Sequence, residues 1–276
     1  VVLMLGWSLN GGDPAWGRLN VPGHVFTQPS IFTWVYLIPP LAMLLLTQWG
    51  APLSTSFLVL STFEFKNSSS LIQISLFGYL IAFFISILLY GLGLWVFERW
   101  IFNTNQSNHS AATVWLITQW LATAFLWAIW LVQDLANVFV FLPRQLELLP
   151  MLMCTVLLCL GLCWLISVGG GPIQGVLRTK TNASDLRSAT AIDLLFGSCL
   201  VGSAMLTSFP LSTTWMFLGL LGGRESALRF HSHRSSQPFA LKDGGHWSEV
   251  LFADLSKASI AMIVSILIAS GLQPLL

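Results

Sequence analysis

Long apolar runs separated by short polar stretches dominate the chain. The runs cover residues 31–49, 71–97, 111–142, 152–168, 188–208 and 250–275. A helix that crosses the hydrocarbon core of a membrane needs roughly 20 predominantly apolar residues, and most of these runs approach or exceed that length. The pattern therefore predicts an all-α integral membrane protein with several spanning helices.

Turn-forming residues and polar clusters set the boundaries between these runs. The G-G-D-P stretch at 11–14 indicates turns within residues 1–30, which we expect to form an extramembrane N-terminal segment. The two prolines at 39–40 are expected to kink or break the helix over 31–49, because proline lacks the N–H that a helix interior needs. The most polar stretch, residues 223–247, predicts a long loop.

One short pattern occurs twice, as A-P-L-S-T-S-F from Ala51 and as F-P-L-S-T-T-W from Phe209. In each copy a proline and its hydroxyls precede an apolar run of about ten residues, which is too short to cross the membrane. Proline suits the first turn of a helix, and Ser or Thr beside it can cap free N–H groups. We interpret both copies as half-helices that begin inside the membrane, where their N–H groups and positive dipole ends can hold an anion.

The two copies divide the chain into related halves, as in transporters whose broken helices face each other near the bilayer midplane. Residues 31–110 are expected to form a partial first repeat with a hairpin and a spanning helix, and residues 111–276 the second repeat. Three predicted crossings lie between the copies, and an odd number inverts the second half relative to the first. The sequence therefore predicts an inverted-repeat transporter with two broken-helix, re-entrant hairpins.

Composition and charge agree with this interpretation. The 276 residues are 55% hydrophobic and only 8% charged, whereas soluble domains carry roughly 25% charged residues. A net charge of +1 without a basic stripe argues against a nucleic-acid partner. With alternating crossings, one side collects Arg99, Arg178, Lys180, Arg187, Arg224, Arg229, Arg234 and Lys242, and the other Arg18, Lys66 and Arg144. The positive-inside bias places the first side, with loops 169–188 and 223–247, in the cytoplasm, at a bacterial-type inner membrane.

Three polar residues interrupt the apolar run over 111–142, and they are the main candidates for ion chemistry. An aspartate inside a spanning helix costs roughly 2.5 to 3.5 kcal/mol, and normally faces a cavity, a partner or an ion path. Asp134 and Asn137 share a helix face, with Gln133 at its edge. Their oxygens suit Na⁺, or a proton held on the aspartate. The alternative is a structural polar contact between helices.

Asp193 is a second acidic residue within an apolar run. It could hold a proton or an ion, or it could pair with Arg187 near the membrane surface.

The two kinds of motif together resemble the inorganic phosphate transporter family of sodium/phosphate symporters. P-L-S-T-[ST] is similar to that family's P-V-S-T-T-H signature, and Gln133-Asp134-Leu135-Ala136-Asn137 is similar to the N-D-V-A-N core of its aspartate motif. The resemblance runs from about Ile31 to the C-terminus. Gln133 replaces an asparagine, and Phe57 and Trp215 stand where histidine is usual. The position that matches Asp134 in the first half would lie before Val1. The first half is therefore expected to lack its aspartate motif, either by truncation or by divergence.

The resemblance implies an inverted-repeat fold that encloses phosphate and its coupling cations, Na⁺ or H⁺. The implied anion ligands are Ser54, Thr55, Ser56, Ser212, Thr213 and Thr214, with Asp134 as a further substrate contact. The cation would lie at Asp134 and Asn137, and the residues themselves add Gln133.

We therefore expect a secondary transporter of an inorganic oxyanion, phosphate in the first instance, coupled to Na⁺ or H⁺. A sulfate permease of the same fold and a transport-incompetent relative acting as a sensor or subunit are the alternatives. An enzyme is not expected, because no second acid, nucleophile–base pair or metal set accompanies Asp134. The expected partners are the oxyanion, the coupling ion, the lipid bilayer and further copies of the chain as a homo-oligomer, with no cofactor beyond the ion.

Overall fold

The computed structural model describes residues 1–21, 24–26, 32–48, 53–63, 65, 68–104, 109–169, 185–206, 211–234 and 247–272. These residues are helical apart from connections and a pair of two-residue antiparallel strands, β1 (Asn20–Val21) and β2 (His24–Val25). The helices are α1 (Val2–Leu9), the 3₁₀ turn η1 (Trp34–Leu37), α2 (Ile38–Gln48), α3 (Thr55–Phe63), α4 (Ser68–Leu89), the π-helical segment η3 (Tyr90–Leu94), α5 (Trp95–Asn103), α6 (His109–Phe139), α7 (Leu148–Ser167), α9 (Leu186–Leu206), α10 (Thr213–Arg234) and α11 (Trp247–Leu272). The prediction of an all-α protein is confirmed.

Within the described residues, four helical stretches are long and apolar enough to cross a membrane. They are Ser68–Ile101, Ala112–Phe139, Leu148–Ser167 and Leu186–Leu206. Large apolar side chains lie exposed along them, as lipid contact requires; Leu157 is 66% exposed and Trp120 71%. Their length and composition indicate a membrane protein.

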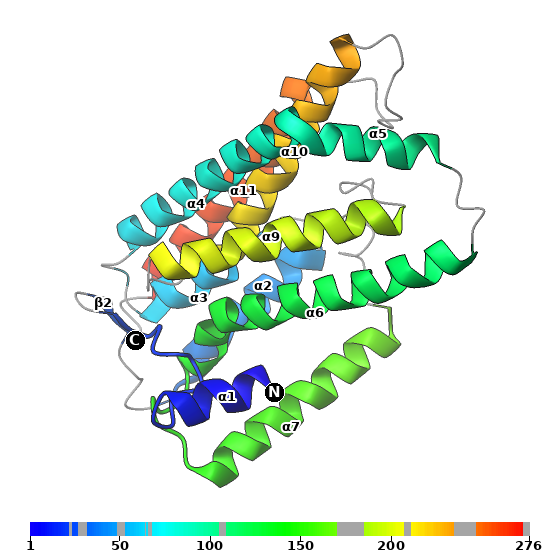
Figure 1. Cartoon of the computed structure of the whole chain (residues 1–276). Helices are drawn as coiled ribbons and strands as arrows, with labels where there is room; N and C mark the ends of the chain where they lie inside the picture. The colour runs from blue at the N-terminus through cyan, green and yellow to red at the C-terminus, as the bar shows by residue number, and fades with distance from the viewer. Residues whose placement is uncertain are drawn as a thin grey trace.

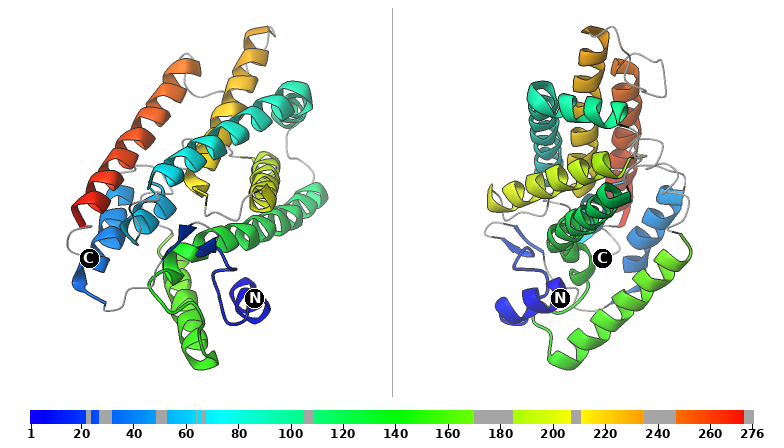
Figure 2. Two further views of the ribbon diagram at one scale, coloured as in Figure 1. Left: turned by 90° about the vertical axis from the view of Figure 1, so that its left-hand side faces the viewer. Right: turned by 45° about the vertical axis from the view of Figure 1, so that its right-hand side comes forward.

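The helices pack in pairs drawn from distant parts of the chain (Figure 1). α4 runs along α10, α6 runs along α9, and the short α3 lies against α11. α10 and α11 lie toward one end of the molecule, while α1 and α7 lie at the other (Figure 2). α1 packs on α6. Helices on both sides of the predicted division between the halves are therefore interleaved.

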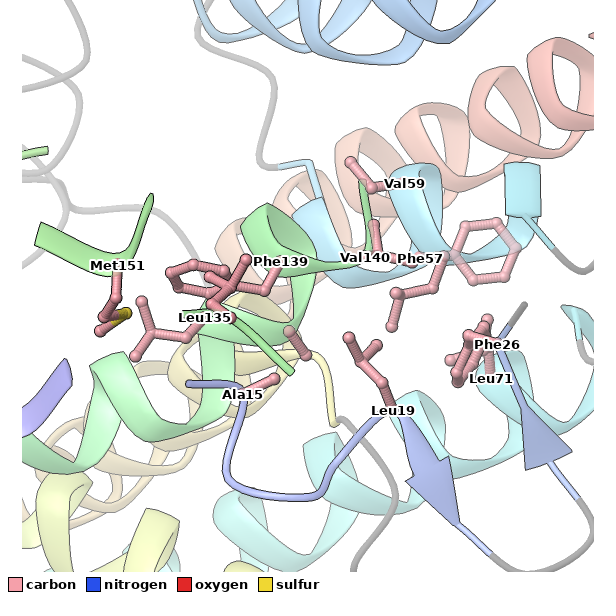
Figure 3. Packing of buried hydrophobic residues seen from close by; sticks show 13 residues of the cluster. Ala15, Leu19, Phe26, Phe57, Val59, Leu71, Leu135, Phe139, Val140 and Met151 are labelled. Atoms are coloured by element: carbon pink, nitrogen blue, oxygen red, sulfur yellow. The ribbon is translucent and has the colours of Figure 1, made fainter. Parts of the chain in front are cut away.

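The largest hydrophobic core joins the N-terminal segment to α3 and α6 (Figure 3). Phe57 of α3 and Phe139 of α6 are almost fully buried, together with Ala15 and Leu19 from the N-terminal connection. Turns were predicted in this connection, and Gly11 and Gly17 do have positive φ angles of 62° and 73°. Its burial was not foreseen, because the same residues were expected to be an extramembrane segment.

α4 and α10 approach each other unusually closely because α10 presents glycines. A Cβ atom added at Gly219 would lie 2.3 Å from the carbonyl oxygen of Tyr79, and one at Gly223 would lie 2.3 Å from that of Phe83. The Ser86 hydroxyl of α4 donates to the carbonyl of Leu220 at 2.7 Å. Small residues four apart let two helix backbones come together in this way.

The predicted polar loop over 223–247 is wrong in its first half, because α10 continues to Arg234. The prediction of a half-helix of about ten residues fails here for the same reason, although α3 is short, with nine residues. Polar residues can continue the helix because they have partners: Arg224 pairs with Glu98 at 2.9 Å, and Arg229 with Glu225 at 2.6 Å. Residues 235–246 lie outside the described part of the chain, as do 170–184 of the other predicted cytoplasmic loop.

The two prolines at 39–40 lie in the first turn of α2, after the 3₁₀ turn η1. The predicted break therefore falls at the start of that helix, where a missing N–H removes no internal hydrogen bond.

Candidate functional site

The two P-L-S-T copies begin two helices in the same manner. Ser54 precedes α3, and its Oγ accepts the backbone N–H of Phe57 at 3.1 Å. Ser212 precedes α10, and its Oγ accepts the N–H of Trp215 at 3.3 Å. Both serines therefore act as helix N-caps through the N3 position. The prolines of the two motifs, Pro52 and Pro210, lie outside the described residues.

The two helix starts contact each other reciprocally. The Thr214 hydroxyl donates to the carbonyl oxygen of Leu53 at 3.0 Å, and the Ser56 hydroxyl lies 3.5 Å from that of Leu211. Ser56 and Thr214 occupy the same position of the motif, as do Leu53 and Leu211. The two contacts therefore join equivalent positions of the two copies, once in each direction.

The polar stretch of α6 lies against both starts. Asn137 Nδ2 donates to Thr55 Oγ1 at 3.2 Å and to Ser56 Oγ at 3.1 Å, at the start of α3. Asp134 faces α10, where the Thr213 hydroxyl lies 3.3 and 3.4 Å from its two carboxylate oxygens. Trp130 Nε1 donates to that hydroxyl at 3.2 Å, which leaves its proton directed at the carboxylate. We call the polar group formed by Asp134, Asn137 and the two helix starts the polar chamber.

The chamber contains an unused acceptor next to a carboxylate. Asn137 is 8% exposed, and its Oδ1 has no hydrogen-bond partner. Its Nδ2 lies 3.4 Å from Asp134 Oδ1, so the two residues are neighbours on one face of α6, as their spacing predicts. A buried oxygen without a donor is costly, and it is a natural ligand for a cation.

Burial differs within the predicted anion ligands. Ser54, Ser56, Ser212 and Thr213 are buried, whereas Thr55 and Thr214 are partly exposed. All six therefore lie at the two helix starts, but only part of the set is open to solvent or to a ligand.

Gln133 takes a different place from that predicted. Its side chain is fully buried, and its Oε1 accepts a hydrogen bond from Nη1 of Arg18, while its Nε2 lies 3.4 Å from the carbonyl of Leu200. Its amide oxygen is thus already occupied by an arginine. Burial lowers the pKa of Arg18 to about 10, against the attraction of Asp134, so the guanidinium stays charged at neutral pH.

Arg18 is the residue near the chamber that sequence reasoning missed. It was counted among the basic residues of an exposed side, yet it is only 5% exposed. Arg187 and Arg224, assigned to the opposite side, are also buried, at 5% and 6% exposure. The local sequence does not distinguish a surface arginine from a buried one, because both kinds occur among the same turn-forming or helix-forming residues.

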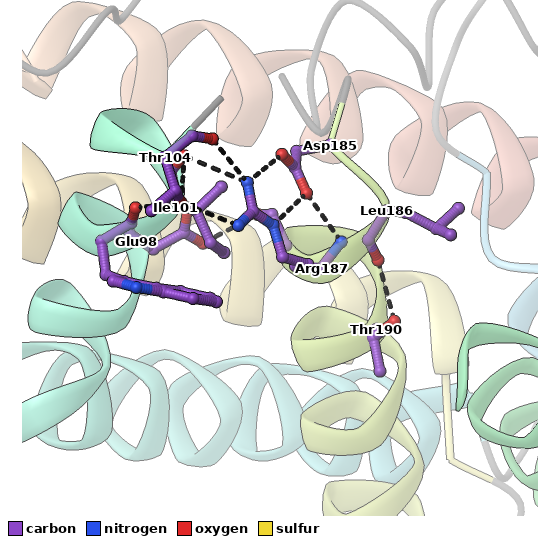
Figure 4. Close-up of polar contacts among 9 residues, drawn as sticks. Glu98, Ile101, Thr104, Asp185, Leu186, Arg187 and Thr190 are labelled. Atoms are coloured by element: carbon purple, nitrogen blue, oxygen red, sulfur yellow. Dashed lines mark hydrogen bonds and ion pairs between the residues drawn. The ribbon is translucent and has the colours of Figure 1, made fainter. Parts of the chain in front are cut away.

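Asp193 belongs to a second polar cluster, in which its predicted pairing with Arg187 is wrong. Its Oδ2 accepts from Gln119 at 2.8 Å and from Thr123 at 2.7 Å, both on α6. Arg187 instead pairs with Asp185 at 2.8 Å (Figure 4). Asp193 therefore ties α9 to α6.

The chamber combines helix N-termini and hydroxyls, which suit an anion, with acidic and amide oxygens, which suit a small cation. In the described part of the chain, no group of three His, Cys, Asp or Glu side chains could hold a metal ion. Comparison with protein-family models, curated proteins and solved structures finds no match to this chain.

Proposed function

We propose that the protein is a secondary transporter of an inorganic oxyanion, phosphate in the first instance, driven by Na⁺ or H⁺. The observation that carries the proposal is the reciprocal contact of two helix starts, with Asp134 and Asn137 between them. The same motifs underlie the resemblance to the inorganic phosphate transporter family. The reaction is translocation of the anion rather than chemistry on it.

The anion would bind at the starts of α3 and α10. The first-turn N–H groups, the positive ends of two helix dipoles and several hydroxyls meet there, and each of these favours a negative charge. Ser54, Thr55, Ser56, Ser212, Thr213 and Thr214 are the proposed ligands. Oxyanions such as phosphate and sulfate offer acceptor oxygens on every side, which matches donors arriving from two opposed helices.

The cation would bind beside it, at Asp134 and the unused Oδ1 of Asn137. Coupling has an energetic reason: moving one negative charge inward against the membrane potential costs about 2.3 kcal/mol per 100 mV, and a co-transported cation offsets that cost. In a shared chamber, the attraction between the anion and the cation also offsets part of the free-energy cost of removing each ion from water.

An inverted repeat with two re-entrant hairpins is the architecture we propose for this mechanism. Its support is the pattern of helix packing: α3 lies against α11, the helix that follows the second start, and α10 lies against α4, the helix that follows the first. Two halves related by a two-fold axis would exchange partners in this way. We retain the proposed cytoplasmic side for 169–188 and for the region after Gly223, at a bacterial-type inner membrane.

A second candidate is a protein that binds the oxyanion without moving it, as a sensor or subunit would. The favouring observation is that groups in the chamber already bond to one another, and that Arg18 holds Gln133. Sulfate remains the alternative substrate of the transporter.

Uptake into proteoliposomes distinguishes the phosphate transporter, the sulfate permease and the sensor. Radiolabelled phosphate should accumulate in vesicles that carry the wild-type protein when a Na⁺ or H⁺ gradient points inward, and sulfate in its place would identify the permease. Asp134→Asn should abolish accumulation, because the cation loses its charged ligand. Gradient-independent binding without accumulation would select the sensor, and normal uptake by Asp134→Asn would overturn the cation assignment.

A further inference from the structure

Arg18 places a permanent positive charge beside the chamber, although it belongs to neither P-L-S-T copy. It donates to Gln133, the neighbour of Asp134 in the sequence, and the Asp134 carboxylate attracts its guanidinium. The Thr213 hydroxyl of α10 lies 3.4 Å from an oxygen of the same carboxylate. Arg18 and the start of α10 therefore converge on one acidic residue.

The loop that carries this arginine is firmly held. The Asp13 carboxylate accepts the N–H of Gly17 at 3.0 Å, and Gly17 turns the chain with a φ of 73°. The connection between α6 and α7 fixes the loop through Leu146, whose N–H donates to the carbonyl of Gly12 at 2.9 Å and whose carbonyl accepts from Trp7 Nε1 at 2.7 Å. The hydrogen bonds within the loop and to the α6–α7 connection hold the backbone around Arg18, so its side chain is preorganised rather than mobile at the surface.

The charges around the chamber show what this arginine adds. Asp134 supplies one negative charge and Arg18 one positive charge, while Gln133, Asn137 and the hydroxyls are neutral. With one bound Na⁺ and a sulfate or hydrogen phosphate ion, which brings two negative charges, the net charge of the chamber would be −2 without Arg18 and −1 with it. A buried charge without a partner is strongly unfavourable. A guanidinium also matches an oxyanion with two parallel N–H donors.

We propose that Arg18 is an oxyanion ligand that serves as a built-in counter-charge and stabilises divalent anions more than monovalent ones. The inference rests on the proposed function and extends it to a residue outside the repeated motifs. The arginine would then do within the chamber what a further coupling cation would otherwise have to do.

Arginine variants of the full-length protein test this directly, through the KM for radiolabelled phosphate uptake and through equilibrium phosphate binding in detergent. Arg18→Gln should raise both constants at least tenfold, and Arg18→Lys should raise them less, because it keeps the charge but loses the planar fork. The loss in Arg18→Gln should be greater for sulfate than for monovalent nitrate, tested as competitors of phosphate. The matched control is Arg187→Gln, another arginine of 5% exposure, whose partners Asp185 and Thr104 do not belong to the chamber.

The outcomes separate this inference from the proposed function. Wild-type uptake with an unchanged phosphate KM and unchanged anion preference in Arg18→Gln would overturn the role of Arg18 and leave the transporter intact. Wild-type binding without uptake would reject transport, and the binding constants of the variants would still decide the role of Arg18. If Arg18→Gln does not fold, Arg18→Lys decides alone, and a phosphate affinity equal to that of the wild type would contradict Arg18 as an oxyanion ligand. Absence of any oxyanion binding in the wild type would remove both proposals.

Discussion

Asp134 and Asn137 show how far single residues can be interpreted from sequence. Two polar residues three apart in an apolar helix must share a face, and the structure brings Asn137 Nδ2 within 3.4 Å of Asp134 Oδ1. Gln133 lay at the edge of that face by the same reasoning. Its partner could not be predicted, because Arg18 is more than one hundred positions away and reaches it only through the folded N-terminal loop.

Asn137→Ala tests whether the unused amide oxygen serves the coupling ion. The change removes Oδ1 and the donors to Thr55 and Ser56, so the half-saturating Na⁺ concentration for phosphate uptake should rise about tenfold, which corresponds to roughly 1.4 kcal/mol. The measurement is the Na⁺ dependence of uptake at saturating phosphate. Asn137→Asp, which retains an oxygen at this position, should recover part of the Na⁺ affinity. An unchanged Na⁺ dependence in Asn137→Ala would mean that the amide only joins helices.

Helices were easier to predict than their ends. Five apolar runs correspond to α4, α6, α7, α9 and α11, and the stretches that contain the first four are long and apolar enough to cross a membrane. The end of α10 was misplaced, since a polar sequence after Gly223 signals a loop unless its charges are paired. Glu98 of α5 provides such a partner for Arg224, and this contact between distant helices has no local signature.

Glycine substitutions should report the close packing of α10 on α4. Gly219→Ala places a methyl group against the Tyr79 carbonyl, which forces the two backbones apart and should cost about 1 to 3 kcal/mol of stability. Gly202→Ala in α9 is the matched control: apart from the adjoining residues and backbone of its own helix, no atom lies within 4 Å of its added Cβ, and alanine favours a helix over glycine by up to about 1 kcal/mol. The apparent unfolding temperature in detergent should therefore fall for the first variant and hold or rise for the second. Equal behaviour of the two would refute the close contact.

In the whole molecule, segments that are far apart in the sequence come into contact. Repetition of P-L-S-T predicted two related helix starts, and in the structure these starts touch through matching atoms of the two copies. The N-terminal segment had no counterpart in that reasoning. It nevertheless packs Ala15 and Leu19 into the main core and places Arg18 beside Gln133. Burial depends on the direction that the turns give to the chain, which the local sequence does not show.

If the anion and the cation occupy one chamber, the binding of each must affect the other. Titration calorimetry of the detergent-solubilised wild-type protein should show Na⁺ tightening phosphate binding by about tenfold or more, and phosphate tightening Na⁺ binding by the same factor. Asp134→Asn should abolish this coupling. Phosphate affinity that is the same in Na⁺ and in a large inert cation such as choline, at constant ionic strength and pH, would contradict a shared Na⁺ site; if changing the pH also left it unaltered, a shared proton site would be contradicted as well.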